Sequence, residues 1–355
     1  MSKPKIGFVG VGGMGQMAHL QNYYTLQDQC EIAAIAEIRD DLRERVAARY
    51  AVPHSYRDHR EMLASEKLDG IVAIQQYGLH GQLIPQLLEY GVPVLTEKPV
   101  GRSVEVGEKV AAAAQKAKGR LYIGYHKRSD PATMLAKKTI ASWMESGAFG
   151  RLRYMRLTMP PGDWIAAGFN GLIHSAESYA GKVQSDAPAA GMSEGEVKRY
   201  EMLVNYYVHQ INLARHLLDE DYVVKYADPT GVVLVANTAS GPALTIEMQP
   251  FRSTIEWREE ALIGFDKGWM NLRLFSPLTH NRAGELTIYE DADGQSPREI
   301  HPTLPHMHAM RQQAIHFIRA IQGEQTPLCL PEDAVKDLVA IRDYLRLFVQ
   351  AGGKV

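Results

Sequence analysis

The sequence of 355 residues has few cysteines, almost no net charge and no long hydrophobic run. Its two cysteines, Cys30 and Cys329, lie in apolar stretches without CxxC spacing, so we expect buried free thiols in a reducing cytoplasm. The 39 Lys and Arg residues against 41 Asp and Glu residues give a formal net charge of −2, which does not draw the protein to nucleic acid or anionic lipid. No apolar segment reaches the length of a signal-peptide core or a membrane span. We therefore expect a soluble cytoplasmic protein without nucleic-acid or membrane partners.

A glycine motif follows the first apolar stretch. Residues 6–9 predict a strand, and Gly10, Gly12 and Gly15 then form G-x-G-x-x-G at the start of a helical pattern. In this context the first glycine permits a tight turn, the second lets the backbone approach a pyrophosphate, and the third lets the helix pack on the strand. The N-terminus of the helix would add free N–H groups and a positive dipole end. The residues that we predict to bind a dinucleotide here are Gly10, Gly12, Gly13, Met14 and Gly15.

The charges after the next predicted strand bear on the choice between NAD and NADP. That strand covers residues 31–38 and carries Glu37 about 22 residues after Gly15, where an acidic residue holds the ribose hydroxyls. Glu37 would repel a 2′-phosphate and therefore favours NAD. Arg39 lies two residues further on and could pair with that phosphate, so NADP stays open as the less favoured cofactor.

Strand and helix patterns alternate through the first third of the chain, which predicts a doubly wound parallel sheet. The alternating segments are 31–38, 39–50, 68–74, 80–91 and 92–99. We therefore expect a Rossmann nucleotide-binding domain over residues 1–127. Ligands of such sheets bind beyond the carboxyl ends of the strands. The segments to examine there are 74–80, 96–101 and 124–131.

Lys98 follows the strand over residues 92–97. A lysine at this place can point its ammonium group into a cleft, where burial and neighbouring charges change its pKa. It can equally be a surface lysine at a strand end. The residues alone leave both interpretations open.

Four features together resemble the Gfo/Idh/MocA family, the oxidoreductases related to glucose-fructose oxidoreductase and inositol dehydrogenase. They are the glycine loop, Glu97-Lys98-Pro99, the segment GYHKRSDPA at 124–132, and a helix after residue 200 that carries His-x-x-Asn. The resemblance covers nearly the whole chain. It implies an α/β Rossmann domain followed by an α+β domain with an open-faced, mostly antiparallel sheet.

The resemblance also implies roles for particular residues. Lys98 takes the place of the lysine that lies beside the nicotinamide and the substrate hydroxyl. His126 stands where asparagine is common and Arg128 at the usual arginine, in a segment that faces nicotinamide and substrate. The loop at 75–80 keeps only the histidine of the family pattern T-P-N-x-x-H. The further residues that the resemblance places at the cofactor are Gln75, Gln76, His80, Glu97 and Lys98.

The pattern changes at about residue 150, where strands follow one another without helices between most of them. This predicts an antiparallel sheet and hence an α+β domain over residues 128–355, for substrate binding and oligomerisation. Helical patterns at 310–323 and 332–350 close the chain and can pack back on the first domain. The family often uses the outer face of its sheet for oligomerisation, which implies a dimer or tetramer.

An irregular segment over residues 160–200 contains Asp163 and Trp164. A carboxylate beside an aromatic ring suits a polyol or a sugar, so we count both residues as candidates for substrate binding. A surface loop anchored by a buried tryptophan explains the segment equally well. His301, His306 and His308 also lie close in sequence, but no Cys, Asp or Glu completes the set, and we expect no metal site.

The stretch NYYVHQINLARH at 205–216 places four polar side chains within about 60° of one another on an ideal helix. A solvated helix face is one interpretation. The stripe has no Lys or Glu, however, and two histidines with two amides suit a cleft better. The four residues are Asn205, His209, Asn212 and His216.

The resemblance implies a role for His209, because the family helix commonly carries D-x-x-x-H beside the lysine of its EKP motif. A neutral histidine can take the proton of a substrate hydroxyl as hydride leaves carbon. Here the aspartate is replaced by Asn205, which carries no charge and leaves the acid/base arrangement incomplete. Asn205 and Asn212 are expected to bind or orient the substrate, whereas His216 is expected to have no such role.

These features predict an NAD(P)-dependent dehydrogenase that moves hydride from a secondary hydroxyl of a sugar, polyol or related carbohydrate to nicotinamide. Lys98 and His209 would be its catalytic residues. An alternative keeps the site but retains NAD tightly, so that a transient oxidation permits elimination of a glycosidic group. A cofactor-binding regulatory protein is the third and less favoured hypothesis.

Overall fold

A computed structural model describes residues 2–177 and 184–355 of the chain. Contacts within the chain divide it into two compact units. The first unit contains Met1–Tyr125, Ala167–Gly191 and Met310–Leu338, and the second contains His126–Ala166, Met192–Ala309 and Val339–Val355. The division of residues 1–127 and 128–355 into a nucleotide-binding and a substrate-binding domain stays a prediction. No helix of the described residues is long and apolar enough to cross a membrane.

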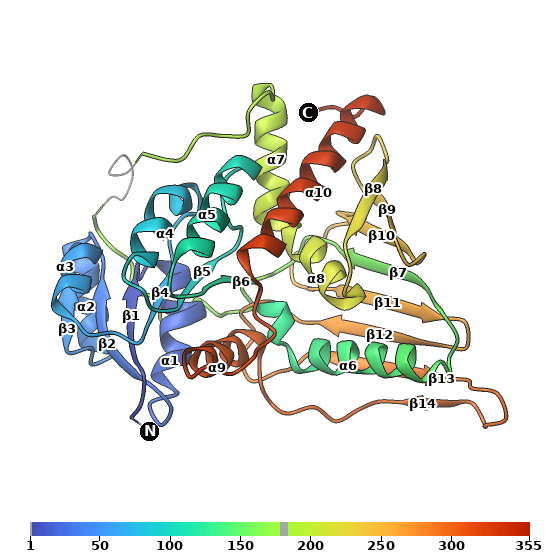
Figure 1. Cartoon of the computed structure of the whole chain (residues 1–355), viewed down its shortest axis with the longest axis horizontal. Coiled ribbons are helices and arrows are strands. Elements are labelled where there is room, and N and C mark those ends of the chain that lie inside the picture. The colour runs from blue at the N-terminus through green and yellow to red at the C-terminus, as the bar shows by residue number, and fades with distance from the viewer. Residues whose placement is uncertain (1, 178–183) are drawn as a thin grey trace. The chain divides into compact units, whose positions relative to one another are not determined.

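The first unit is built on sheet A, a parallel sheet of six strands in the order β3-β2-β1-β4-β5-β6 (Figure 1). Its strands are β1 (Lys5–Val9), β2 (Glu31–Ala36), β3 (His54–Tyr56), β4 (Gly70–Ala73), β5 (Val94–Glu97) and β6 (Leu121–Gly124). Its helices are η1 (Gly15–Leu20), α1 (Gln21–Tyr24), α2 (Asp40–Arg49), α3 (His59–Ser65), η2 (Tyr77–Leu79), α4 (His80–Leu88), α5 (Val104–Lys116) and α9 (Ala309–Ile321). The strand order reverses between β1 and β4, which is where such sheets bind ligands. The expected doubly wound sheet is confirmed.

Three neighbouring strands of sheet A, β4, β5 and the edge strand β6, are buried along their whole length. Such burial on both faces is typical of a parallel sheet covered by helices. Helix α9 supplies part of this cover, with the ring of Phe317 in edge-to-face contact with Tyr122 at 6.2 Å between ring centroids. Gly70 leaves room for Ile321, because a Cβ atom at Gly70 would lie 2.4 Å from Ile321 Cδ1. The C-terminal region therefore completes the core of the nucleotide-binding sheet.

The helix after the glycine loop differs from the expected regular α-helix. Residues Gly15–Leu20 form a π-helix, and a regular helical turn follows only over Gln21–Tyr24. The side-chain amides of Gln21 and Asn22 donate to the carbonyl oxygens of Met17 and Ala18, each four residues earlier. Side chains that bond to the helix carbonyls in this way compete with the regular i→i−4 ladder.

The second unit is built on sheet B, which has eight strands in the order β14-β13-β12-β11-β7-β10-β9-β8. Its strands are β7 (Leu152–Met159), β8 (Tyr222–Ala227), β9 (Val233–Thr238), β10 (Ala243–Met248), β11 (Glu259–Phe265), β12 (Gly268–Leu274), β13 (Glu285–Glu290) and β14 (Arg298–Ile300). Every pair is antiparallel except β7 with β10. The prediction of a mostly antiparallel sheet is confirmed.

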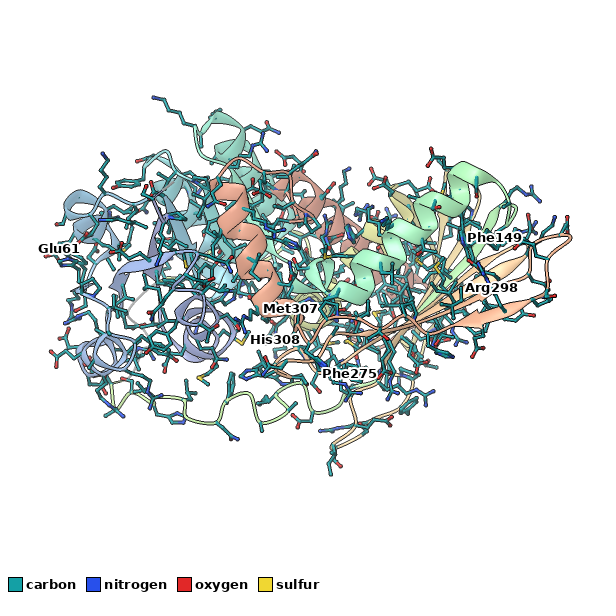
Figure 2. The ribbon with its side chains drawn as sticks, turned by 90° about the horizontal axis from the view of Figure 1, so that it is seen from below. Glu61, Phe149, Phe275, Arg298, Met307 and His308 are labelled. Carbon is teal, nitrogen blue, oxygen red and sulfur yellow. The ribbon has the colours of Figure 1, made fainter. Side chains whose placement is uncertain are left out.

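Helices of the second unit lie along one face of sheet B, where α6 contacts β12 and β13 while α8 contacts β7 and β10 (Figure 1). The helices of this unit and the long C-terminal helix are η3 (His126–Ser129), α6 (Pro131–Ser146), α7 (Glu194–Tyr206), α8 (Val208–Leu218) and α10 (Pro331–Gln350). Asp130 begins α6 by accepting the N–H of Ala132, and Phe149 stacks on Trp143 near its other end (Figure 2). The face of the sheet toward these helices is apolar, as β7 shows with Met155, Leu157 and Met159 buried.

The polar stretch at 205–216 is divided between two helices. Helix α7 ends at Tyr206 and α8 begins at Val208, because the backbone ladder stops after the bond from Tyr207 N–H to Leu203 O and restarts on Tyr207 O. The ring of Tyr206 meets Trp257, and the Tyr207 ring is buried. The assumption of one ideal helix is therefore wrong. Asn205 and His209 stand on either side of the break.

Candidate functional site

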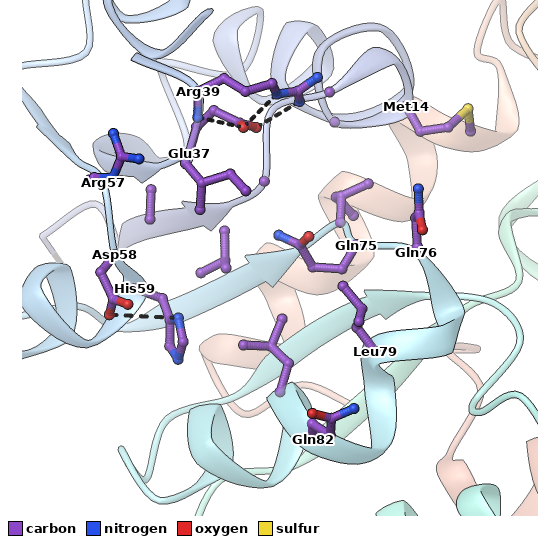
Figure 3. Close-up of a pocket in the computed structure, with 18 of the residues that line it drawn as sticks. Met14, Glu37, Arg39, Arg57, Asp58, His59, Gln75, Gln76, Leu79 and Gln82 are labelled. Atoms are coloured by element: carbon purple, nitrogen blue, oxygen red, sulfur yellow. Dashed lines mark hydrogen bonds and ion pairs between the residues drawn. The ribbon is translucent and has the colours of Figure 1, made fainter. Parts of the chain in front are cut away.

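A cavity of about 660 Å³ opens at the carboxyl ends of β1, β2 and β4 in the first unit (Figure 3). This size falls in the range of ordinary ligand pockets. Nine of the expected cofactor residues line it: Gly10, Gly12, Gly13, Met14, Gly15, Glu37, Arg39, Gln75 and Gln76. Other residues around it include Arg57, Asp58, His59, Leu79 and Gln82.

The three motif glycines meet different surroundings. Gly10 has a φ of +88°, and a Cβ atom there would lie 2.4 Å from Ile74 O. A Cβ atom at Gly15 would lie 2.5 Å from Gly10 O. At Gly12, by contrast, the nearest atom to a new Cβ is Arg39 Nη2 at 3.4 Å. Gly10 and Gly15 are thus required by the turn itself, whereas Gly12 leaves space that a pyrophosphate can approach.

This difference predicts separate effects for two alanine substitutions. Gly12→Ala should fold normally but bind NADH about tenfold or more weakly, because the new methyl group occupies the space beside the phosphates. Gly15→Ala should lower the free energy of unfolding by about 1–3 kcal/mol, because the helix must move away from Gly10. Thermal melting and NADH fluorescence titration separate the two effects. Unchanged NADH affinity in a folded Gly12→Ala variant would contradict the assignment of the loop.

Glu37 and Arg39 form an ion pair inside the cavity (Figure 3). Arg39 Nε donates to Glu37 Oε1 at 2.8 Å, and Arg39 Nη2 donates to Glu37 Oε2 at 3.1 Å. The N–H of Val11 also donates to Glu37 Oε2 at 3.2 Å. The carboxylate is therefore held against the glycine loop, and its charge is offset by a guanidinium that also lines the cavity. Both cofactor interpretations keep a physical basis here.

The segment Glu97-Lys98-Pro99 is fixed by buried neighbours at the end of β5. Glu97 Oε1 lies 2.7 Å from His19 Nε2, and Glu97 Oε2 accepts the N–H of Lys98 at 3.2 Å. His80 Nδ1 lies 2.9 Å from Pro99 O, and burial lowers the pKa of His80 to about 4. His80 therefore acts as a neutral brace for the segment. Lys98 itself is half-buried.

Among the described residues that line the cavity, three expected cofactor contacts are missing: His80, Glu97 and Lys98. For His80 the reason is physical, because its ring is fully buried and turned to the Pro99 carbonyl. A single histidine in a loop sequence does not reveal such an orientation. The sequence thus indicated the loop correctly as part of the cavity through Gln75 and Gln76, while the side chain of His80 serves packing.

Residues 167–177, which belong to the first unit, lie against the glycine loop. A Cβ atom at Gly13 would lie 3.8 Å from both Phe169 and Leu172. Buried Gln16 exchanges two hydrogen bonds of 3.1 Å with the backbone of Ile173. Sequence reasoning missed Gln16. Its only signal in the sequence was a polar residue between the apolar residues that follow the glycine loop.

Two histidines and an arginine–amide pair lie together in the second unit. The His126 ring, on η3, contacts the His209 ring, on α8, edge to face with 5.1 Å between centroids. Arg128 Nε donates to Asn212 Oδ1 at 2.8 Å, and both side chains are buried. The expected residues of the GYHKR segment and of the His-x-x-Asn helix are thus neighbours. Asn212 orients Arg128.

A buried carboxylate lies beneath this group. Lys127 Nζ donates to both oxygens of Glu259 at 2.5 and 2.6 Å, and Gln210 Nε2 donates to Glu259 Oε1 at 2.8 Å. Trp257 Nε1 donates to Glu259 Oε2 at 3.3 Å. Burial lowers the pKa of Lys127, which the charge of Glu259 opposes. Sequence reasoning missed Lys127, Gln210 and Glu259.

The other expected substrate residues have local roles in this structure. Asn205 is exposed at the end of α7. Asp163 Oδ1 accepts the N–H groups of Ile165 and Ala166, both at 3.0 Å, and so caps its own turn. Trp164 is half-buried, and its carbonyl oxygen accepts the N–H of Leu278 at 3.4 Å. These contacts favour the anchored-loop interpretation of the segment around Asp163 and Trp164.

His216 is buried behind Arg128 and stays neutral. Burial, together with the positive charges of Arg128 and Lys137, lowers the pKa of His216 to about 2. The unfolded chain protonates this histidine near its ordinary pKa of 6.5, so its contribution to stability is present above pH 6.5 and is lost as the pH falls toward 2. A neutral, buried His216 is unsuited to proton transfer at neutral pH.

This linkage predicts how acid affects the fold. Between about pH 7 and about pH 5 the melting temperature of the unsubstituted protein should fall, because unfolding exposes His216 and lets it bind a proton. The melting temperature of His216→Asn should fall less over the same range, because asparagine binds no proton. Melting curves across this range check the prediction, with the exposed His54→Asn as the matched control. Parallel losses in all three proteins would show that His216 is not linked to folding in this way.

A small hollow of the second unit is lined in part by Phe275 and His308, both labelled in Figure 2. Its lining includes His126, Lys127 and Arg282. His308 stacks on His280 at 5.2 Å and accepts the N–H of Asn281. Within residues 2–177 and 184–355, no group of three or more His, Cys, Asp or Glu side chains is arranged to hold a metal ion.

The first unit matches a known family. Residues 4–125 match the sequence model of a family described as an oxidoreductase family with an NAD-binding Rossmann fold, Gfo/Idh/MocA. This match covers the strands of sheet A and the glycine loop, and it ends at residue 125. The glycine loop, the cavity and the Glu97-Lys98-Pro99 segment all lie within the residues that match this NAD-binding family model.

Curated relatives and a solved structure extend this comparison. An inositol 2-dehydrogenase of Rubrobacter xylanophilus is 28% identical over 182 residues, which cover 49% of this chain and 50% of that protein. A myo-inositol 2-dehydrogenase of Thermotoga maritima is 24% identical over 166 residues, covering 45% and 48%. The chain thus spans about half the length of these curated relatives. An oxidoreductase domain protein of Kribbella flavida shares the fold over 99% of this chain and 98% of its own, with a TM-score of 0.75 at 19% identity.

Proposed function

We propose that the protein is an NAD-dependent dehydrogenase that oxidises a secondary hydroxyl of a polyol, sugar or related carbohydrate. The observation that carries the proposal is the family's NAD-binding domain with its braced lysine at Lys98. Two inositol dehydrogenases that match this chain over about half of their length support the substrate class. In this proposal residues 1–127 bind the nucleotide and residues 128–355 bind the substrate.

The cofactor supplies the hydride chemistry when it is bound, and the chain aligns it. We propose that the glycine loop holds the pyrophosphate and that Glu37 holds the adenosine ribose. Arg39 would then have to share Glu37 with the ribose hydroxyls, or turn to the 2′-phosphate of NADP. Dissociation constants for NADH and NADPH, measured by nucleotide fluorescence, decide between these two uses of Arg39.

In the proposed reaction Lys98 polarises the substrate hydroxyl and His209 takes its proton. His126 and Arg128 contact the substrate, and Asn212 supports Arg128. Helix α7 carries Asn205 in place of the expected aspartate. His126 provides a second imidazole beside His209. A neighbouring imidazole can share a proton, which Asn205 cannot do. The substrate roles of Asn205, Asp163 and Trp164 stay predictions.

A specific observation favours a second candidate reaction, in which NAD is retained and regenerated within one cycle of oxidation and elimination. The loop over residues 167–177 packs on the glycine loop through Phe169 and Leu172, and Asp41 Oδ2 accepts the N–H of Ala176 at 2.8 Å. Such contacts beside the phosphate loop would slow the release of the cofactor. Nucleotide that copurifies with the protein and survives gel filtration would support retention.

The test of the leading proposal is NADH formation with a panel of inositols, sugar acids and aldoses. A rise in absorbance at the NADH band with at least one polyol, dependent on both cofactor and protein, is expected. Product release from glycosides without net NADH would instead support the retained-cofactor reaction. Nucleotide binding without turnover on either panel would support the regulatory alternative.

We further propose that the protein forms a dimer or tetramer through the face of sheet B that points away from α6 and α8. Val223 and Tyr226 of β8 are exposed large side chains on this sheet, which suits burial against a second copy. Light scattering after gel filtration tests the assembly. The two cysteines are buried free thiols, which fits the reducing cytoplasm that we propose as its location.

A further inference from the structure

Glu259, at the start of β11, accepts hydrogen bonds from Lys127 of η3 and from Gln210 of α8. It lies in the first position of β11, on the same face as the buried Ala261 and Ile263. Its side chain is 2% exposed, and that of Lys127 is 6% exposed. Burying an ion pair costs desolvation that mere packing would avoid, so an apolar pair would serve stability at least as well. The retained charges therefore call for another explanation.

The partners of Glu259 are placed between candidate substrate residues. Lys127 lies in η3 between His126 and Arg128. Gln210 lies in α8 directly after His209 and two residues before Asn212. The same two segments also meet directly through the His126–His209 rings and the Arg128–Asn212 bond. The η3 segment and helix α8 are thus joined twice, once through Glu259 and once by direct side-chain contacts.

We propose that Glu259 is a positioning residue for the substrate-binding half of the proposed enzyme. Through Lys127 it fixes the place of His126 and Arg128, and through Gln210 it fixes the place of His209. Side chains that act on a substrate must be held to within a fraction of an ångström, and their supports commonly decide this. The inference rests on the proposed function for its catalytic consequence but not for its geometry.

The geometry also explains why a carboxylate, and not an apolar side chain, occupies position 259. The Glu259 carboxylate accepts from an ammonium, an amide and an indole N–H in different directions, and Trp257 adds a cation–π contact to Lys127 at 5.9 Å. A buried carboxylate with several donors has one low-energy orientation. An apolar side chain of similar size would fill the space without fixing the direction of its neighbours.

The test compares Glu259→Gln with the double variant Lys127→Met/Glu259→Met. Glu259→Gln leaves Lys127 buried without its counter-ion and is expected to be less stable. The double variant removes both charges together and is expected to remain folded. Glu260→Gln is the matched control, because Glu260 is the next residue of β11, lies on the other face and pairs with Arg258 at 3.0 Å.

The first readout is the pair of ring signals of His126 and His209 in NMR spectra, assigned with single His→Asn variants. The chemical shifts of both rings should change in the double variant, because each ring lies close to the other and its shift depends on their relative position. The shifts should stay the same in Glu260→Gln. The second readout is turnover, which should fall about 100-fold with NADH affinity changed less than about twofold. A merely structural pair would lower the melting temperature and leave ring signals and turnover of the folded protein unchanged, which would overturn the proposal.

These readouts separate two failures. If no polyol supports turnover in the unsubstituted protein, the proposed reaction fails, while the ring signals still report whether Glu259 sets the histidine pair. If turnover is present and the folded double variant keeps both it and the ring signals, the reaction stands and the positioning role of Glu259 fails.

Discussion

His209→Ala is expected to lower kcat by about 100-fold to 10,000-fold, the usual contribution of a positioned general base. His209 is half-buried in the first turn of α8 with its ring against His126, so its removal takes away the side chain that is best placed in the second unit to accept a hydroxyl proton. The affinity for NADH should change little, because the nucleotide cavity is formed by the first unit. Initial rates of NADH formation with the best polyol of the panel measure the effect.

The control for this prediction is His301→Ala, which removes an exposed histidine paired with Glu299. Added imidazole should restore part of the lost turnover in His209→Ala, because the substitution opens space for a small base. Rescue of this kind distinguishes proton transfer from a loss of packing. If His126→Asn loses as much turnover as His209→Ala and the double variant loses no more, the two rings act as one proton-transfer unit. Turnover within about threefold of the unsubstituted rate in His209→Ala would remove the histidine from the mechanism.

The fold of the first unit follows from the sequence because its signals are local. Apolar runs with intervening helical patterns predicted four of the six strands, β1, β2, β4 and β5, and G-x-G-x-x-G located the cavity. The sequence did not predict β6 as a strand and named only the segment at 124–131 that follows it. It also missed β3, His54–Tyr56, which has three half-exposed or exposed residues at the edge of the sheet. No burial pattern marks such a strand. The sequence did not reveal the π-helix over Gly15–Leu20 either, where the side chains of Gln21 and Asn22 donate to the carbonyl oxygens of Met17 and Ala18.

The candidate site was harder to predict because its residues interact across distant segments. The sequence indicated His126, Arg128, His209 and Asn212 by resemblance, and the structure brings these four together. An ideal helix placed Asn205 beside them, but the break at Tyr207 leaves it exposed on α7. Glu259 did leave a signal. It occupies an inward position of an alternating strand, where a charge needs a buried partner, but the sequence does not say that Lys127 is that partner.

Lys98→Met is expected to lower kcat by about 100-fold to 1,000-fold, the usual loss when one donor to a developing negative charge is removed. Methionine keeps the length of the side chain without its ammonium group. The backbone should stay in place, because Glu97 holds it through His19 and the Lys98 N–H, and His80 holds Pro99. The change should therefore appear in kcat while the melting temperature stays the same.

The distinction between a catalytic and a surface lysine rests on matched substitutions. Lys98→Arg keeps the positive charge but replaces a compact ammonium with a planar group, so it should recover only part of the lost rate. Lys109→Met removes an exposed lysine of α5 in the same unit and should leave kcat unchanged. If Lys98→Met behaves like Lys109→Met, the lysine is a surface residue at a strand end, and the proton and charge chemistry must be carried by the second unit alone. A large loss in Lys98→Met together with imidazole rescue of His209→Ala would assign charge stabilisation to Lys98 and proton transfer to His209.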